Sequence, residues 1–521
     1  MTTATGELPT DLEACHQLIR ELLQSLVEQA HLAEKLQHQL ELLLRQRYGR
    51  KTETVDPAQL LLFAREILAA AEPPAPEPAP PAEAPPAPAS QPKKGGHGRK
   101  PLPAHLPRKP ILHDVPADRL PCPDCGTMRV RIGEEVREQL EYVPASLIVL
   151  RHVRPKYACK CCEGNIVIAE RLPEPIEKGL PGPGLMAQVA VSKYADHLPL
   201  YRQEGIYRRH GVELPRQTTC GWMAVCADLL EPIYNAMHRL ILESKVIQTD
   251  DTTLTMLHPT LGKITARVWV YLGDRAHPYT VYHFTENRSG EGPREMLAGY
   301  EGYLQADAFS GYDALFTDGK IVEAGCMMHG RRKFYEARTT DPPRAHQALA
   351  WINLLYKVEE EAKEKGFTEA QRYALRREKS RPLLDKLKEW LDHEDQQRVL
   401  PKSPIGEAIG YARNHWAALE RYLEAGYLEI DNGASERAMK PVALGRKNWL
   451  FAGSAAGGRT AAILMSLCTT CKTLGVDPLA YLTDVLGRVS THPNSRLEEL
   501  LPDRWHAIRA AAAQAEGERA E

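Results

Sequence analysis

Apolar residues recur at heptad spacing near the start of the 521-residue chain. When Leu12 is taken as the first position, every a and d position up to Leu43 is apolar except Gln29. This pattern predicts a short coiled coil over residues 1–48 that joins copies of the chain into a homo-oligomer. The alternative is an amphipathic helix that packs on its own protein, because the seam is close to the shortest that such a pattern identifies. A short helical segment, residues 49–72, is expected to follow.

Residues 73–100 are not expected to form a packed domain. Ten of the 40 prolines lie between Pro73 and Pro92, which predicts an extended, polyproline-like linker. The linker runs into a basic arm that begins at Lys93 and contains no acidic residue as far as Pro110. An arm of this kind can lie along a phosphate backbone.

The pattern after the linker predicts a multidomain α/β protein. Short β-like runs surround two cysteine pairs in residues 101–178, which we interpret as a small module. Residues 179–244 are expected to form several helices with Gly211 in a turn, a pattern compatible with a helix-turn-helix DNA-binding region. Strands return from Lys245 to Val322, so a mixed α/β core is expected there.

Helical spacing resumes between Asp341 and Gly426, in a stretch rich in Ala, Leu, Glu, Lys and Arg. We expect an all-helical insertion at about 341–426 inside a central domain that spans residues 245–455. A helical C-terminal region, residues 456–521, is expected to complete the chain. The pair Cys468 and Cys471 lies in an apolar helix of that region, so core packing is the better explanation for it.

The formal net charge is only −2, with 66 basic and 68 acidic residues, which excludes a uniformly basic protein. Basic residues are instead segregated, in the arm, in the stretch His329 to Phe334, and between Arg437 and Val476, where no acid occurs. Together these clusters indicate nucleic acid as the partner, although each alone could be a solvated face. The candidate contacts, for which structural roles are the alternative, are Lys93, Lys94, Arg99, Lys100, His329, Arg331, Arg332, Arg437, Lys440, Arg446 and Lys447.

The N-terminus has neither a basic nor an apolar leader segment, and no window of the sequence matches a membrane span. We therefore expect a cytoplasmic, nucleoid-associated protein with no membrane partner. Five of the 11 cysteines lie between Cys122 and Cys162, which in a reducing compartment indicates a metal site. Two CxxC pairs offer four thiolates to one structural Zn²⁺, and Cys161 leaves the choice of the second pair open. The predicted ligands are Cys122, Cys125, Cys159 and Cys162.

Three carboxylates are candidates for a catalytic centre. Asp250 lies on one expected strand, Asp307 ends another, and Glu436 lies in the first turn of an expected helix that Asn432 caps and Pro441 interrupts. In an RNase H-like sheet these acids can surround one point and hold two Mg²⁺ or Mn²⁺ ions about 3.5–4 Å apart for attack on a phosphodiester. Strand periodicity does not choose between Asp250 and its neighbour Asp251. The alternative for each acid is an ordinary strand-end, turn or ion-pairing residue.

These stretches resemble the DDE transposases of the insertion-sequence sixty-six family over nearly the whole chain apart from the proline-rich linker. The matching segments include "CPDCG", "RHVRPKYACKCC", "QTDDT", "LQADAFSGYD", "CMMHGRRKF", "DNGASERAMKPVALGRKNWLFAGS" and "CKTLGVDPLAYLTDVL". The resemblance selects Asp250, Asp307 and Glu436 as the catalytic acids and implies a helical insertion between the last two. Lys440 and Met327 stand where Arg and Trp are expected in relatives.

The resemblance implies a transposase that binds the terminal inverted repeats of its element, cuts and joins element and target DNA, and works with accessory proteins of the same element. The first alternative is a zinc-containing DNA-binding or regulatory protein, derived from a transposase, that no longer catalyses. The second is a nuclease of the same fold that hydrolyses DNA without joining it.

Overall fold

A computed structural model describes residues 147–152, 156–157, 167–168, 173–177, 179–393, 396 and 398–520, together with scattered positions between 13 and 36. The chain divides into two compact units, one formed by residues 1–73 and 167–521 and the other by residues 74–166. The basic arm, the proline-rich linker and all four predicted zinc ligands lie outside the described residues. Strands β1 (Lys156–Tyr157) and β2 (Val167–Ile168) are two residues long each.

The described N-terminal positions are helical, in agreement with the heptad pattern. Ile19, Leu22, Leu26 and Leu36, which occupy predicted seam positions, are each more than half exposed. Apolar side chains at this spacing need a partner surface, so the coiled coil stays a prediction that these exposures favour. No helix among the described residues is long and apolar enough to cross a membrane.

A five-stranded mixed sheet forms the centre of the larger unit, which confirms the predicted mixed α/β core. The sheet order is β5-β4-β3-β6-β7: β3, β4 and β5 are antiparallel neighbours, and β6 and β7 run parallel to β3. Successive side chains of a strand point to opposite faces, and the apolar run from Val268 to Tyr271 in β4 is buried on both faces of the sheet, with Trp269 and Tyr271 completely buried. The strands are β3 (Val246–His258), β4 (Gly262–Leu272), β5 (Thr280–Thr285), β6 (Gly302–Gln305) and β7 (Ile321–Ala324).

Helices before and after the sheet share one hydrophobic core with it. Helix α15 runs along β5, where the Ser466 hydroxyl accepts from the Tyr282 amide at 2.8 Å. Cys468 and Cys471 are buried in this core, as expected. Gly211 adopts φ +77° between α4 and α5, as a turn there requires. These helices are α3 (Pro183–Tyr194), α4 (Leu200–Arg209), α5 (Arg216–Ile241), α15 (Ala455–Thr473), α16 (Pro478–Arg488), η5 (Asn494–Leu500) and α17 (Pro502–Ala520).

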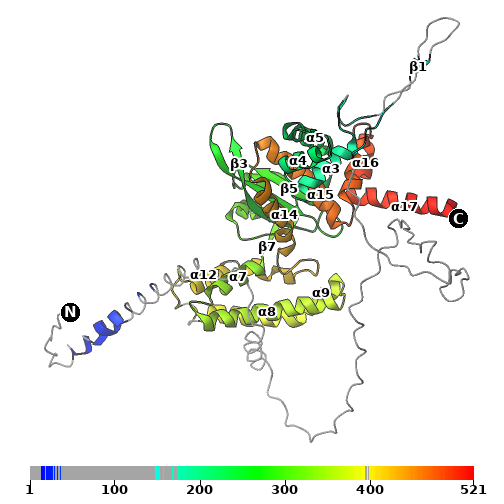
Figure 1. Cartoon of the computed structure of the whole chain (residues 1–521). Coiled ribbons are helices and arrows are strands. Elements are labelled where there is room, and N and C mark those ends of the chain that lie inside the picture. The colour runs from blue at the N-terminus through cyan, green and yellow to red at the C-terminus, as the bar shows by residue number, and fades with distance from the viewer. Residues whose placement is uncertain are drawn as a thin grey trace, which may run out of the picture. The chain divides into compact units, whose positions relative to one another are not determined.

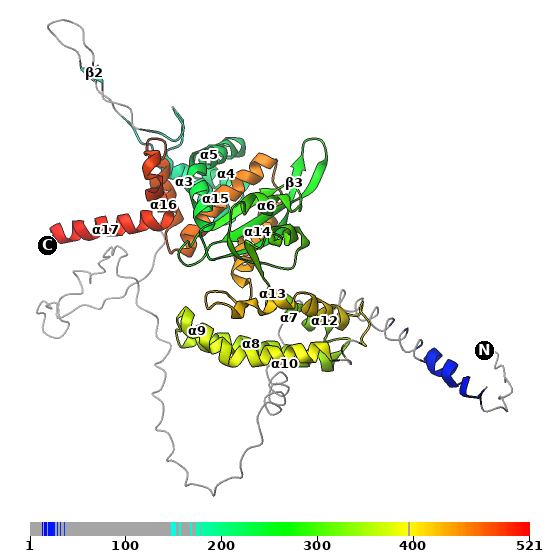
Figure 2. The ribbon, with the colours of Figure 1, turned by 180° about the vertical axis from the view of Figure 1, so that it is seen from behind.

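The stretch expected to be an insertion is helical, and no strand occurs among its described residues. Its helices lie beside one another in both views (Figure 1 and Figure 2) and pack around a second hydrophobic core that includes Leu355, Leu387 and Ile409. The elements are α8 (Pro342–Glu364), α9 (Glu369–Leu375), the π-helical η3 (Arg376–Ser380), α10 (Arg381–Asp392), α12 (Pro404–Asn414), α13 (Trp416–Glu420) and η4 (Arg421–Leu423).

Four further elements complete the larger unit. They are α6 (Glu291–Met296), η2 (Ser310–Phe316), α7 (Met327–Ala337) and α14 (Gly433–Trp449). Helix α6 lies between β5 and β6, η2 lies between β6 and β7, and α7 and α14 connect the sheet to the insertion. Helix α7 leads from β7 into the insertion, and α14 returns from the insertion along β3 and β4. The chain therefore leaves and re-enters the sheet at the helices that carry His329 and Glu436.

Candidate active site

Asp250 lies in β3, the strand that pairs with β4 on one side and with β6 on the other. Burial raises the pKa of Asp250 to about 7, and the charges of Asp307, Glu436 and Asp251 act in the same direction. Among the described residues, its carboxylate accepts a hydrogen bond from the Asp251 amide at 2.8 Å. Asp250 is thus a partly buried acid that faces two other acids from distant parts of the chain.

The neighbouring Asp251 has a different environment. Its side chain is 3% exposed and accepts from Arg267 Nη1 at 2.9 Å and from Arg288 Nη2 at 2.8 Å. Two guanidinium groups therefore already neutralise this carboxylate, whereas the negative charges of Asp307 and Glu436 act on Asp250. Of the two acids that strand periodicity left open, Asp250 is therefore the better candidate for the site.

Asp307 follows the end of β6, which runs parallel to β3. Burial raises the pKa of this carboxyl, while His329 and Arg288 lower it. Arg288 Nη2 lies 3.8 Å from Asp307 Oδ2 as well as next to Asp251. The Arg288 guanidinium, which also stacks 3.8 Å from the centre of the Phe309 ring, thus borders the site on this side.

Glu436 lies in the first turn of α14, as predicted, where the helix dipole favours a negative charge. Its Oε1 is buried without a hydrogen-bond partner among the described residues, and His329 Nε2 lies 3.7 Å from it. Arg332 Nη2 lies 4.0 Å from the other oxygen. An unsatisfied buried carboxylate oxygen is costly unless a ligand completes it, which makes this atom a candidate metal ligand.

The N-terminus of α14 is fixed to the strand that carries Asp250. Asn432 is fully buried, and its amide donates to the Thr249 carbonyl at 3.1 Å, while Ser435 Oγ donates to the same carbonyl at 3.3 Å. Asn432 is the N-cap residue of α14, as predicted, but its side chain makes no capping hydrogen bond: its Nδ2 is directed to β3, and its Oδ1 has no hydrogen-bond partner among the described residues. Asp431 Oδ1 instead accepts from the Gly433 amide at 2.9 Å.

The predicted interruption of this helix at Pro441 is wrong. Helix α14 continues through Pro441 to Trp449. Proline removes one backbone donor and disturbs the carbonyls of the preceding turn. The Tyr282 hydroxyl on β5 donates to the Ala438 carbonyl in that turn, at 2.5 Å, which offers a partner from outside the helix.

Two buried glutamines join the elements that carry the acids. Gln248 precedes Asp250 by two residues, Gln305 precedes Asp307 by two residues, and Gln248 Nε2 donates to Gln305 Oε1 at 3.0 Å. Gln305 Nε2 donates onward to the Glu429 carbonyl at 2.6 Å, in the loop before α14. The repeated spacing Gln-x-Asp was visible in the sequence, but its meaning was missed because each glutamine finds its partner on another element.

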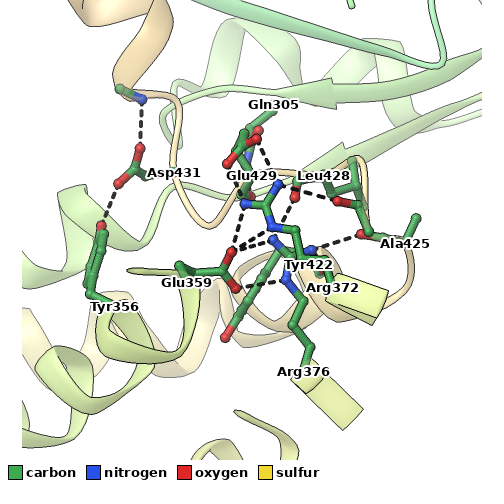
Figure 3. Close-up of polar contacts among 12 residues, drawn as sticks. Gln305, Tyr356, Glu359, Arg372, Arg376, Tyr422, Ala425, Leu428, Glu429 and Asp431 are labelled. Atoms are coloured by element: carbon green, nitrogen blue, oxygen red, sulfur yellow. Dashed lines mark hydrogen bonds and ion pairs between the residues drawn. The ribbon is translucent and has the colours of Figure 1, made fainter. Parts of the chain in front are cut away.

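The insertion holds the same loop by side chains, as Figure 3 shows. Tyr356 of α8 donates to Asp431 Oδ2 at 2.6 Å. Arg372 of α9 donates to Glu429 Oε1 at 2.9 Å and to Glu359 Oε2 at 2.8 Å. The segment that leads to Glu436 is thus tied to the helical insertion on one side and to the sheet on the other.

The three carboxylates fit divalent ions that prefer oxygen ligands. They come from β3, the end of β6 and α14. Burial raises the pKa values of Asp250 and Asp307, and Glu436 Oε1 has no hydrogen-bond partner among the described residues. Cys326 also lies near Glu436 and His329, with possible ligand atoms within 4.8 Å of one another. Burial raises the pKa of the Cys326 thiol to about 12. Oxygen donors select Mg²⁺ or Mn²⁺.

The candidate DNA contacts in the described residues fall on two helices beside Glu436. His329, Arg331 and Arg332 lie on α7, and Arg437, Lys440 and Lys447 are exposed on α14. Arg446 differs from them, because its Nη1 donates to Thr252 Oγ1 at 2.9 Å and to the Thr253 carbonyl at 2.6 Å. Arg446 therefore joins α14 to β3, so a structural role is the better explanation for this residue than a DNA contact.

Family models match four parts of the chain. The model described as "Transposase IS66 family" matches residues 178–460, which include all three acids. The "zinc-finger binding domain of transposase IS66" matches residues 121–163, the range that holds the four predicted zinc ligands. "Transposase C of IS166 homeodomain" matches residues 35–111, and "IS66 C-terminal element" matches residues 466–502.

Proteins of Sinorhizobium fredii (strain NBRC 101917 / NGR234) are similar over most of their length. Uncharacterized protein y4qI is 38% identical over 428 residues, which cover 79% of this chain and 78% of the relative. Uncharacterized protein y4hP is 33% identical over 440 residues, with 79% and 78% covered. Uncharacterized protein y4jD is 35% identical over 424 residues, with 78% and 82% covered.

Proposed function

The chain belongs to the IS66 family of DDE transposases, and from this premise we propose that it binds the terminal inverted repeats of its insertion sequence and catalyses cleavage and strand transfer of DNA. The observation that carries the proposal is the approach of three carboxylates from separate elements, with burial and mutual repulsion raising the pKa of Asp250 to about 7. Buried acids held together at this cost are typical of a functional site. The order of three antiparallel strands followed by two parallel ones supports an RNase H-like core for it.

In the proposal Asp250, Asp307 and Glu436 would hold the divalent ions, whose positive charge would offset the mutual repulsion of Asp250 with the other two acids. When bound, two Mg²⁺ or Mn²⁺ ions activate water or a DNA 3′-hydroxyl and stabilise the leaving oxygen. The role of the protein is to fix the acids. The Gln248–Gln305 hydrogen bond sets β3 against β6, and Thr249 anchors the first turn of α14.

Positive charge surrounds the acids on both sides of the proposed scissile phosphate. His329 and Arg332 approach Glu436, while Arg288 approaches Asp307. We propose that Arg437, Lys440 and Lys447 contact the DNA backbone along α14, because phosphate contacts supply affinity and register. Lys93, Lys94, Arg99 and Lys100, in the arm outside the described residues, are proposed to do the same.

The zinc-finger match suggests zinc, and we propose one structural Zn²⁺ held by Cys122, Cys125, Cys159 and Cys162. Four thiolates close the coordination sphere, so the ion stabilises the module and does not react. We further propose that the coiled coil joins copies of the chain, since two element ends must be brought together. Accessory proteins of the same element remain part of the proposal.

The test is Mg²⁺-dependent cleavage and joining of DNA that carries the element's own ends, with Glu436→Gln compared with the wild type. Glu407→Gln is the matched control, because Glu407 also lies in the first turn of a helix, α12, but is exposed. We expect Glu436→Gln to bind the ends and lose all products, while Glu407→Gln keeps them. Equal products from all three proteins remove Glu436 from the chemistry.

Binding without cleavage by the wild type favours a DNA-binding or regulatory protein that is derived from a transposase and no longer catalyses. Hydrolysis without strand-transfer products favours a nuclease. The intact set of three approaching acids argues against the first of these outcomes, because a purely DNA-binding protein gains nothing from carboxylates whose burial is costly.

A further inference from the structure

The exposed face of α14 forms a continuous track that begins at Glu436. Arg437, Lys440, Leu444 and Lys447 are exposed and recur three or four residues apart, so they lie on one face of the helix. No acidic residue occurs between Arg437 and Val476. The track is therefore basic along its length, with one apolar side chain in the middle.

The track ends in a strained turn. Leu450 has φ +66° and ψ −44°, and the Phe451 amide donates to the Trp449 carbonyl at 2.8 Å across it. These features define a classic γ-turn, a rare and strained conformation that a residue with a side chain avoids unless its surroundings impose it. Ala452 imposes it here, because its amide donates to the Thr255 carbonyl at 2.9 Å and its carbonyl accepts from Leu257 at 3.0 Å.

The strained turn presents apolar side chains to solvent. Leu450 is 64% exposed and Phe451 is 42% exposed. Arg202 on α4 donates to Asn448 in the last turn of α14 at 3.3 Å, and its neighbour Tyr201 is 51% exposed. Arg202 also stacks on the Tyr201 ring at 5.6 Å. The strained backbone at Leu450 thus places a leucine and a phenylalanine on the surface between basic side chains.

We propose that Leu450 and Phe451 insert between stacked bases of the DNA bound along α14. Apolar wedges of this kind unstack a base step and kink the duplex, and basic side chains beside them hold the phosphates. A second copy of this chain is the less favoured occupant, because Lys447 and Arg202 flank the apolar residues and no acid of α14 beyond Glu436 offers them a partner.

The position of the wedge relative to the cut follows from the helix. Leu450 lies 14 residues after Glu436, which corresponds to about 21 Å at the helical rise of 1.5 Å per residue. Because successive base pairs are about 3.4 Å apart, the unstacked step lies about six base pairs from the scissile phosphate. This inference rests on the proposed function, since it takes Glu436 as the point where the DNA is cut.

The experiment uses the full chain and a duplex from one element end, with 2-aminopurine placed at successive positions near the cleavage site. Its fluorescence rises when the base is unstacked. The variants are Leu450→Gly, Phe451→Ala and the double variant that combines them. The control is Ile508→Ala, which removes a 50% exposed apolar side chain from α17. Glycine adopts positive φ without strain, so Leu450→Gly is expected to melt no lower than the wild type.

We expect the wild type and Ile508→Ala to brighten 2-aminopurine at one step about six base pairs from the cut. The double variant Leu450→Gly/Phe451→Ala loses this signal and binds the duplex about tenfold more weakly, the order of one lost stacking contact. If the double variant is as stable as the wild type but loses the signal, the two side chains act on the DNA and not on the stability of the fold.

Four results overturn the inference. If the wild type cleaves the duplex but brightens no position, the wedge is wrong and the proposed function stands. If the double variant keeps the signal, other residues unstack the base. If the double variant changes the oligomeric state of the protein without DNA, as light scattering measures it, the apolar surface faces a second copy. A wild type that neither binds nor cleaves the duplex refutes both the wedge and the proposed function.

Discussion

Arg376 in the insertion is the residue through which we test how the loop before α14 is held in place. Arg376 is completely buried, and Nε and Nη2 donate to the two oxygens of Glu359 at 2.7 and 2.8 Å. Nη1 donates to the Tyr422 and Ala425 carbonyls at 2.7 and 2.9 Å, and Nη2 donates to Leu428 at 2.8 Å (Figure 3). All five N–H donors of the side chain are therefore used.

Replacing Arg376 with Met removes this charge but keeps an unbranched apolar chain of similar length. The change leaves three buried carbonyls without their donor and takes one of two cations away from Glu359. Breaking a buried ion pair from one side costs about 3–5 kcal/mol. Because Arg372 still donates to Glu359 at 2.8 Å, we expect a loss in the middle of that range, about 4 kcal/mol.

The measurement is native-state hydrogen exchange of the amides in α9 and α10, because a multidomain chain does not unfold in one step. The matched control is Arg413→Met on α12, whose guanidinium lies 3.1 Å from Asp392 with both side chains 40% exposed. A surface pair of this kind contributes about 0–1 kcal/mol, so the control is expected to change little.

We also expect Arg376→Met to lower DNA cleavage more than DNA binding. Arg376 holds the Leu428 carbonyl, and the chain reaches Asn432 and the first turn of α14 only a few residues later. A loss below about 1 kcal/mol, equal to that of the exposed control, refutes the reasoning that this guanidinium clamps the segment.

Two further predictions concern protonation and zinc. Because the folded-state pKa of Asp250 is about 7, above its unfolded value of about 3.9, this carboxyl lowers the stability of the metal-free protein as pH rises from about 4 to about 7. Asp250→Asn should remove that fall in melting temperature, and an unchanged pH profile contradicts it. Chelation of zinc should expose residues 121–163 to protease and weaken end binding without shifting the melting of the central sheet, whereas equal protease resistance with and without chelator contradicts the zinc site.

Sequence patterns identified the elements whose signals are local. The strands from Lys245 to Val322 and the helical insertion stand close to where alternation and helical spacing put them. Each of these elements carries its own apolar face, so its pattern survives without knowledge of its neighbours.

The details that the patterns did not resolve depend on contacts between distant residues. Asp250 and Asp251 are equivalent in a strand pattern, and only Arg267 and Arg288, on other elements, make them different. Helix α14 passes through Pro441, where a tyrosine from β5 meets a carbonyl of the preceding turn. Asn432 bonds to β3 in place of its own helix, which no local rule for capping can foresee.

The position of Glu436 in a basic field follows from the geometry of one helix. Its carboxylate is half-buried next to His329, whereas Arg437, Lys440 and Lys447 occupy the exposed face. Side chains one residue apart on a helix point about 100° away from each other, so an acid and a base can face different partners. In the proposed complex the acids bind metal cations, and the basic side chains along α14 bind phosphates. Both sets of charges are then paired only when the ions and the DNA are bound together. Tight binding of the ions should therefore depend on bound DNA, and a Mg²⁺ affinity that is equal with and without duplex contradicts this coupling.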